Sequence, residues 1–322
     1  MNEILNRRKF INRSSAFALG GAMAGSAFSA RGFAAPAAAA AGGDLLKGAC
    51  IGVFPRDIPV MERFRMAKEA GFMGIEPNTI KTPEEVAEYK KASETTGVKI
   101  VSIMNSDHWN FPLSDDDPEV VKKSVDCVKT SMQNAKELGA DTILLVPGVV
   151  TAKVGYDQVY ERSQAEIKKL LPLAEELKVV IGIENVGNRF LMSPLEFAQY
   201  VDDFNSPYVK AYFDVGNVAR NGFPHDWIRI LGKRLVKIHI KAFQPGREHP
   251  LFDPESRNTQ GISWPDVRKA ISNAGYKGWI ISEVGSGDAA YLKELSARVD
   301  KIFNGENPVP AEEQEAPPAR RG

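Results

Sequence analysis

The feature that most constrains the fold of this chain is a regular alternation of short β-rich runs with amphipathic stretches. Each run is followed by a segment with apolar residues at helical spacing, and strands that alternate with helices indicate a parallel sheet. Eight repeats of such a unit fit a closed (β/α)₈ TIM barrel, which we expect to be a single domain. The eight candidate strands are Gly48–Phe54, Gly74–Pro77, Lys99–Met104, Thr142–Val146, Val179–Asn185, Val209–Asp214, Leu235–Ile240 and Trp279–Val284.

Local signals mark the helices between these strands. Asp117-Pro118 can start a helix whose apolar face continues through Val128 and Met132. Thr82-Pro83-Glu84-Glu85 and Ser193-Pro194-Leu195-Glu196 resemble capping boxes with proline at the first helical position. An open doubly wound sheet is the alternative fold, and it often carries a glycine-rich phosphate loop after its first strand. Here that strand leads into Pro55-Arg56-Asp57 without a glycine pair, which favours the barrel.

The two ends of the chain differ from this pattern. Residues 1–43 place Arg7-Arg8 before a weakly apolar, alanine-rich stretch and a run of small residues that suits a signal peptidase. This segment resembles a twin-arginine (Tat) signal, which predicts export by the Tat machinery to the periplasm or beyond the cell. Residues 307–322 combine four prolines with Glu and Arg and predict a disordered tail. The barrel is therefore expected over residues 44–306.

Composition narrows the classes of function. Lys plus Arg and Asp plus Glu both number 41, so the formal net charge is zero, whereas a nucleic-acid-binding protein usually carries a basic excess. Two cysteines, Cys50 and Cys127, cannot form a disulfide framework. No apolar run reaches the roughly 18 residues of a membrane helix, so we expect no stable membrane anchor. A homo-oligomer is compatible with the sequence but not indicated by it.

Four consecutive candidate strands end in side chains that can bind a metal ion. These are Glu184, Asp214, His239 and Glu283. The active sites of TIM barrels lie at the carboxyl ends of the strands, so the four side chains are expected to meet in one mouth. Three carboxylates and one imidazole suit one divalent ion, with Mn²⁺ preferred and Mg²⁺, Co²⁺ or Zn²⁺ as alternatives.

The same segments carry a family resemblance. The strings IENVGNRFLMSPLEF, KAYFDVGNVARNGFPHDWIRILGKR, VKIHIKAF and GYKGWIISEV resemble the sugar phosphate isomerase/epimerase family. This xylose-isomerase-like TIM barrel group includes ketose 3-epimerases and hexulose-phosphate 3-epimerases. The resemblance implies that Glu184, Asp214, His239 and Glu283 hold one ion and that Glu184 and Glu283 are the catalytic acid/base pair. One carboxylate would remove the proton beside a ketose carbonyl, giving an enediolate, and the other would return it to the opposite face.

Some residues depart from the family pattern. Ala242 follows His239-Ile240-Lys241 where many relatives have an acid, and Asn217 stands where tagatose-type epimerases have histidine. Both changes affect the substrate side of the site rather than the predicted ligands. The residues expected to line the substrate site are Glu76, His108, Trp109, Asn185, Asn188, Asn217 and Lys241. Trp109 either packs against a sugar face or anchors its loop, and Lys241 either binds substrate or forms a rim salt bridge.

Several functions remain open at this stage. Removal of the proton beside the carbonyl of a 3-keto-glycoside could instead expel its C1 substituent, which would make the protein a lyase. The endonuclease IV branch of the superfamily needs more histidines than the four present and a basic face. An exported sugar-binding protein would not need two carboxylates at a metal. The partner is therefore expected to be a small sugar or keto-glycoside, and Asp288 beside Gly285-Ser286-Gly287 argues against a phosphorylated one, because its charge would repel phosphate.

Overall fold

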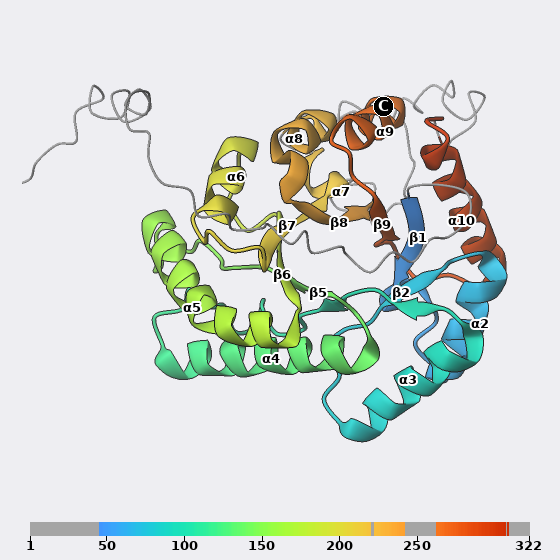
Figure 1. Ribbon diagram of the computed structural model, residues 1–322, viewed down its shortest axis with the longest axis horizontal. Helices are drawn as coiled ribbons and strands as arrows, with labels where there is room; N and C mark the ends of the chain where they lie inside the picture. Colours follow the sequence, from blue (N-terminus) through green and yellow to red (C-terminus); the bar gives the residue numbers. More distant parts are fainter. Residues whose placement is uncertain (1–44, 220–221, 242–261, 307, 309–322) are drawn as a thin grey trace, which may run out of the picture. The chain divides into compact units, whose positions relative to one another are not determined.

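The computed structural model describes residues 45–219, 222–241, 262–306 and 308. Its strands form one parallel sheet in the order β3-β2-β1-β9-β8-β7-β6-β5-β4 (Figure 1). The strands are β1 (Leu45–Cys50), β2 (Gly74–Glu76), β3 (Lys99–Ile100), β4 (Ile103–Met104), β5 (Thr142–Leu145), β6 (Val180–Glu184), β7 (Val209–Asp214), β8 (Leu235–Ile240) and β9 (Gly278–Ser282). The predicted ends of β7 and β8 agree with the structure residue for residue.

The third predicted strand, Lys99–Met104, is interrupted and appears as β3 and β4. Its backbone still joins both neighbours, because Val101 N donates to Ile75 O (3.1 Å) and Asn105 N donates to Leu144 O (3.0 Å). The segment Lys99–Met104 therefore lies between β2 on one side and β5 on the other and joins the two edges of the sheet. Eight strand–helix units together make a nearly closed barrel. The prediction of a (β/α)₈ TIM barrel is confirmed.

Helices follow the strands in chain order. They are α2 (Val60–Ala70), α3 (Pro83–Thr96), α4 (Pro118–Leu138), α5 (Tyr156–Leu177), α6 (Pro194–Asp202), α7 (Val215–Val218), α8 (Pro224–Leu231), α9 (Trp264–Asn273) and α10 (Ala289–Phe303), with short 3₁₀ turns at Ile51–Val53 and Gly232–Arg234. The last helix, α10, contacts the first, α2, so the helices also close around the strands. The cap residues are those that the sequence marks: Thr82 forms a complete capping box, and Asp117 and Ser193 accept bonds from the first turns of their helices.

The first predicted strand differs from the structure at both of its ends. The first strand begins at Leu45, earlier than expected, and residues Ile51–Val53 form a 3₁₀ turn instead of continuing it. The predicted signal segment, 1–43, lies outside the described residues, as does the predicted tail apart from Pro308. Among the described helices, none has the length and apolar character needed to cross a membrane.

Polar residues inside the barrel are stacked in layers along β8. Lys237, His239 and Lys241 occupy alternate positions, and their side chains contact Asp141, Glu76 and Glu283 on other strands or loops. The intervening Ile238 and Ile240 are buried on the opposite face of the strand. Because side chains alternate across a strand, β8 presents its polar residues to the interior and its apolar residues to the helices. This pattern buries His239 inside the barrel, near the carboxyl end of β8.

Candidate active site

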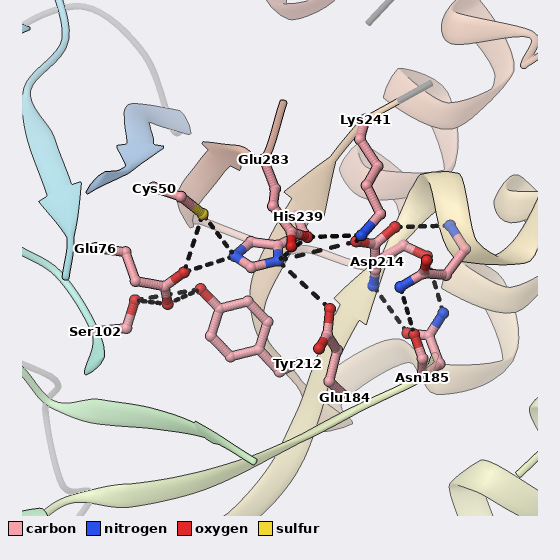
Figure 2. A network of polar contacts seen from close by, with 11 residues as sticks. Cys50, Glu76, Ser102, Glu184, Asn185, Tyr212, Asp214, His239, Lys241 and Glu283 are labelled. Atoms are coloured by element: carbon pink, nitrogen blue, oxygen red, sulfur yellow. Dashed lines mark hydrogen bonds and ion pairs between the residues drawn. The ribbon is translucent and has the colours of Figure 1, made fainter. Parts of the chain in front are cut away.

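The four predicted metal ligands meet at the carboxyl ends of β6 to β9. His239 Nδ1 lies 3.5 Å from Glu184 Oε1, 3.9 Å from Asp214 Oδ2 and 3.1 Å from Glu283 Oε2 (Figure 2). One ligand atom from each of these residues lies within 4.8 Å of all the others. His239 and Asp214 are fully buried, and Glu184 nearly so, whereas the Glu283 side chain is 31% exposed and faces the mouth.

The spacing of these atoms suits a single ion. Ligands about 2.1 Å from a metal stand roughly 3 to 4 Å apart, which is the range of the measured separations. Asp214 Oδ2 and His239 Nδ1 are both buried, and their near neighbours are charged groups: Lys241 Nζ lies 3.0 Å from Asp214 Oδ2, and Glu283 Oε2 lies 3.1 Å from His239 Nδ1. Three carboxylates and an imidazole nitrogen that face one position are costly to bury without positive charge between them, so they indicate a place for a cation. The residues present therefore fit a divalent ion.

Lys241 contributes the one ammonium group that touches this cluster among the described residues. Its Nζ lies 3.0 Å from Asp214 Oδ2 and 2.7 Å from Glu283 Oε2. These two carboxylates raise the pKa of Lys241 against the opposing effect of its burial. The sequence left Lys241 either as a substrate contact or as part of a rim salt bridge, and in the structure its ammonium pairs with two of the predicted ligands.

The two glutamates of the predicted acid/base pair differ in their surroundings. Burial, helped by the charge of Glu283, raises the pKa of Glu184 to about 7. Burial acts in the same direction on Glu283, but His239 and Lys241 outweigh it and hold the pKa of Glu283 below its usual range. A pair of carboxyl groups with separated pKa values can hold a proton on one member while the other is ionised, which is the arrangement that acid/base chemistry needs.

Glu76 lies beneath His239 and not in the mouth where the sequence placed it. It is completely buried, and its Oε2 lies 2.8 Å from His239 Nε2. The hydroxyls of Ser102 and Tyr212 donate to its Oε1 at 2.5 and 2.6 Å, and the Cys50 thiol donates to Oε2 at 3.3 Å (Figure 2). Both oxygens of Glu76 therefore already have partners within the protein.

Three asparagines predicted to contact substrate are used to shape the loops. The Asn185 side chain accepts from Asp214 N (2.8 Å) and donates to Asp214 O (2.9 Å), which ties the end of β6 to the end of β7. Asn217 Nδ2 donates to Asn185 O, and its backbone N–H donates to Asp214 Oδ1. Asn188 Nδ2 donates to Gly148 O, and its Oδ1 accepts from Phe190 N. These bonds fix the direction of Asp214 and of the loop after β6.

His108 and Trp109, in the loop after β4, have opposite exposures. His108 is 4% exposed and its Nδ1 has no hydrogen-bond partner, while Trp109 is 51% exposed. The two rings meet edge to face, 5.4 Å between centroids. Burial lowers the pKa of His108 to about 4, against the opposing charges of Glu283 and Asp107, so its imidazole is neutral at physiological pH. A neutral histidine near Glu283 and an exposed indole are compatible with the substrate contacts predicted for them.

The sequence did not reveal Cys50, Ser102 and Tyr212 as parts of this region. Their signal is alternation: Tyr212 lies two residues before Asp214 on β7, so both side chains point to the same face. Cys50 was interpreted only as a small apolar residue, yet its Sγ lies 3.6 Å from His239 Nε2. Counting back two residues from Asp214 would have found Tyr212, whereas Cys50 and Ser102 lie on segments that carry no predicted metal ligand.

Comparison with known proteins gives the family. Residues 64–301 match the family described as the xylose isomerase-like TIM barrel. The chain belongs to this family. One curated relative of this xylose isomerase-like barrel is the L-ribulose-5-phosphate 3-epimerase UlaE of Shigella boydii. It is 24% identical over 220 residues, which are 61% of this chain and 74% of the relative.

Solved structures extend the comparison of the barrel. A D-tagatose 3-epimerase-like protein superposes with a TM-score of 0.69 at 18% identity, covering 80% of this chain and 98% of that protein. The 3-keto-D-glucoside 4-epimerase YcjR from E. coli gives a TM-score of 0.67 at 16% identity, covering 81% and 99%. The named relatives are epimerases, in agreement with the enzyme class predicted from the sequence. At these identities the structural matches establish the fold alone.

Proposed function

We propose that the protein is a divalent-metal-dependent sugar epimerase that moves a proton at the carbon beside a ketone. The observation that carries this proposal is the convergence of Glu184 and Glu283, from the ends of different strands, on the position that His239 Nδ1 and Asp214 Oδ2 also face. Two carboxylates at one cation position are what inversion through an enediolate needs, because each can serve one face of the carbon. The epimerase relatives support the same class of reaction.

Glu184, Asp214, His239 and Glu283 would hold the ion. When bound, it supplies positive charge that stabilises the negative oxygen of an enediolate. Glu184 and Glu283 accept and return the proton at their carboxylate oxygens. Asn185 and Asn217 hold Asp214 in place through its backbone and Oδ1, and Lys241 neutralises part of the surplus charge around Asp214 and Glu283.

We further propose that the substrate carries no phosphate. TIM barrels often bind phosphate at the start of a helix near the last strands, which here is the start of α10. Asp288 occupies that position, and its own carboxylate accepts from Tyr291 N at 2.9 Å. A carboxylate already caps the helix and would repel a phosphate. The proposed substrate thus differs from the one named for the relative, L-ribulose-5-phosphate, which carries a phosphate.

A second candidate is the lyase that acts on 3-keto-glycosides with the same proton abstraction. The similarity to a 3-keto-D-glucoside 4-epimerase supports keto-glycosides as substrates. The exposed Trp109 offers an apolar face for a second ring or aglycone at the rim. In a lyase, one glutamate would remove the proton and the other would assist departure of the C1 substituent.

One experiment separates these functions. The Mn²⁺-loaded protein is incubated in D₂O with free ketoses, their phosphates and 3-keto-glucosides, and the products are analysed by mass spectrometry and NMR. We expect deuterium at the carbon beside the carbonyl, an epimeric product from an unphosphorylated sugar, and no reaction after chelation. Two product molecules from one substrate would identify a lyase, and absence of exchange with every compound would refute both readings.

We also propose export by the Tat pathway, supported by Arg7-Arg8 and the small residues that follow. Replacing both arginines by lysine should retain the full-length protein in the cytoplasm while leaving the purified barrel active. Unchanged export of that variant, measured by cell fractionation, would contradict the proposal.

A further inference from the structure

We propose that Glu76 is a positioning residue that fixes His239 in the tautomer and orientation needed to hold a metal ion through Nδ1. This inference rests on the proposed function, because it concerns the same ion. It assigns a role to a buried carboxylate that touches neither the ion position nor the mouth. It also explains why the Glu76 carboxylate is completely buried inside the barrel.

The two nitrogens of His239 have different surroundings. Nε2 lies 2.8 Å from Glu76 Oε2, whereas Nδ1 faces Glu184, Asp214 and Glu283, the last at 3.1 Å. An ionised carboxylate accepts hydrogen bonds and cannot donate them, so Nε2 carries a proton for Glu76. When a cation takes the position among the three carboxylates, Nδ1 gives up its proton and offers its lone pair, while Glu76 keeps the remaining proton on Nε2, as a metal ligand requires.

Glu76 is itself held in a fixed position. Its Oε1 accepts from Ser102 Oγ and Tyr212 OH, and its Oε2 accepts from the Cys50 thiol beside His239. The side chain is completely buried, and hydrogen bonds of this kind stabilise the ionised form of a carboxylate that would otherwise be costly inside a barrel. The charge and direction of Glu76 are therefore set by Cys50 at the end of β1, Ser102 between β3 and β4, and Tyr212 on β7.

Tyr212 also restricts the imidazole ring. Its ring packs edge to face against His239, with centroids 4.7 Å apart and an interplanar angle of 70°. This position is open because residue 182 is glycine: a Cβ there would lie 2.9 Å from Tyr212 Cδ2. His239 is thus fixed by a hydrogen bond on one edge and by an aromatic contact on its face.

A different reading of the same residues is a second ion site. Cys50, Glu76 and His239 also place one ligand atom each within 4.8 Å of one another. Both oxygens of Glu76 already accept bonds from protein groups, which favours the positioning role. Metal stoichiometry distinguishes the two readings, because a second site would bind a second ion that depends on Cys50.

The test measures metal binding instead of turnover. Co²⁺ is titrated into the metal-free full-length protein, followed by its visible absorption, for the wild type and for Glu76→Gln. The glutamine keeps the shape, but one of its ends must donate, and a neutral amide polarises the ring less. We expect the dissociation constant to rise by about 10- to 100-fold, the usual effect of removing a partner behind a metal-ligating histidine.

A matched control is Glu196→Gln, because Glu196 also accepts from a tyrosine hydroxyl, that of Tyr156, at 2.6 Å. This control should change Co²⁺ affinity by less than about twofold. Thermal unfolding of each metal-free variant separates loss of packing from loss of affinity. If Glu76→Gln binds Co²⁺ as tightly as the wild type, the positioning role is wrong. If the wild type binds no divalent ion, the proposed function fails instead.

A second measurement does not depend on a variant that must fold. The chain has four histidines, so ¹⁵N-histidine NMR of the wild type with diamagnetic Mg²⁺ or Zn²⁺ can be assigned. We expect His239 to carry its proton on Nε2. A proton on Nδ1, or two bound ions of which Cys50→Ser removes one, would overturn the inference.

Discussion

The two ends of the barrel interior differ in whether their buried charged groups have partners of opposite charge. At the amino-terminal end, the Lys237 ammonium is paired with Asp141 at 2.7 Å, and that carboxylate is open to solvent. At the carboxyl-terminal end, Glu184, Asp214 and Glu283 surround His239 Nδ1, and Lys241 is the one ammonium in contact with them in the described part of the chain. One end is balanced, and the other carries a surplus of negative charge.

One segment supplies both ends, since Lys237 and His239 lie on β8 and Lys241 follows it directly, at alternate positions. Carboxylates within 4 Å of a common point repel one another strongly in a buried environment, so their arrangement is unfavourable without a cation. The Lys237–Asp141 pair leaves little excess charge at the balanced end, whereas under the proposed function the unbalanced end binds a positive ion.

The strongest test of this contrast removes acid/base capacity while leaving the shape of the unbalanced end unchanged. Glu184→Gln and Glu283→Gln keep one ligating oxygen but cannot accept a proton. We expect each to retain some metal and to lose roughly 10²-fold or more in rate, the usual scale for a positioned acid or base. Rates and bound metal are measured on the same preparations, so that loss of the ion is not mistaken for loss of the proton acceptor.

Isotope exchange sharpens this prediction. If the two glutamates serve opposite faces of the carbon, one variant should still exchange the hydrogen of one epimer with D₂O, and the other variant only that of the opposite epimer. Near-normal turnover in either variant would show that another group is the base. Lys241 and His108 are the nearest alternatives that the structure offers.

The sequence predicted the barrel and the convergence of the four ligands because both follow from strand periodicity. Side chains at the carboxyl ends of parallel strands must share one mouth, whatever the loops do. The roles of Glu76 and Asn185 could not be derived in this way. Glu76 ends a strand like the ligands, but its carboxylate contacts Tyr212, one inward-facing position before Asp214 on β7, and the sequence does not show this stagger between strands.

The asparagines show a second limit. Asn185 follows Glu184 directly, and its side chain is used by the backbone of Asp214, 29 positions further along the chain. That contact depends on the register between β6 and β7, which pairs Glu184 with Tyr212. Sequence spacing places a residue near the site, but it does not show which of its hydrogen bonds are already satisfied.

His108 offers a smaller test at the unbalanced end. Its pKa is lowered by burial to about 4, below the usual value of 6.5, so the unfolded chain binds the proton more readily than the folded one. The stability that this contributes is present above pH 6.5 and is lost as the pH falls toward 4. Relative to His108→Gln, the wild type should lose about 2 kcal/mol of unfolding free energy between about pH 7 and about pH 5.

Urea unfolding of both proteins at several pH values, with chelator present throughout, measures this difference. Equal pH dependence in the two proteins would mean that folding leaves the pKa of His108 unchanged, because the charges of Glu283 and Asp107 then offset the effect of burial.

The smallest effect is expected at the balanced end. Lys237→Met keeps the length of the side chain and its burial while removing the ammonium, and the Asp141 carboxylate that loses its partner is 57% exposed and still accepts from Thr142 Oγ1. Since water can solvate that carboxylate, the free energy of unfolding should change by only about 1 kcal/mol or less. Co²⁺ affinity should stay within about twofold of the wild type, because the ion position lies one layer above and its ligands are untouched. A larger loss of Co²⁺ affinity would mean that the charge of Lys237 influences His239 through the barrel interior. The charges at the two ends would then not be independent of each other.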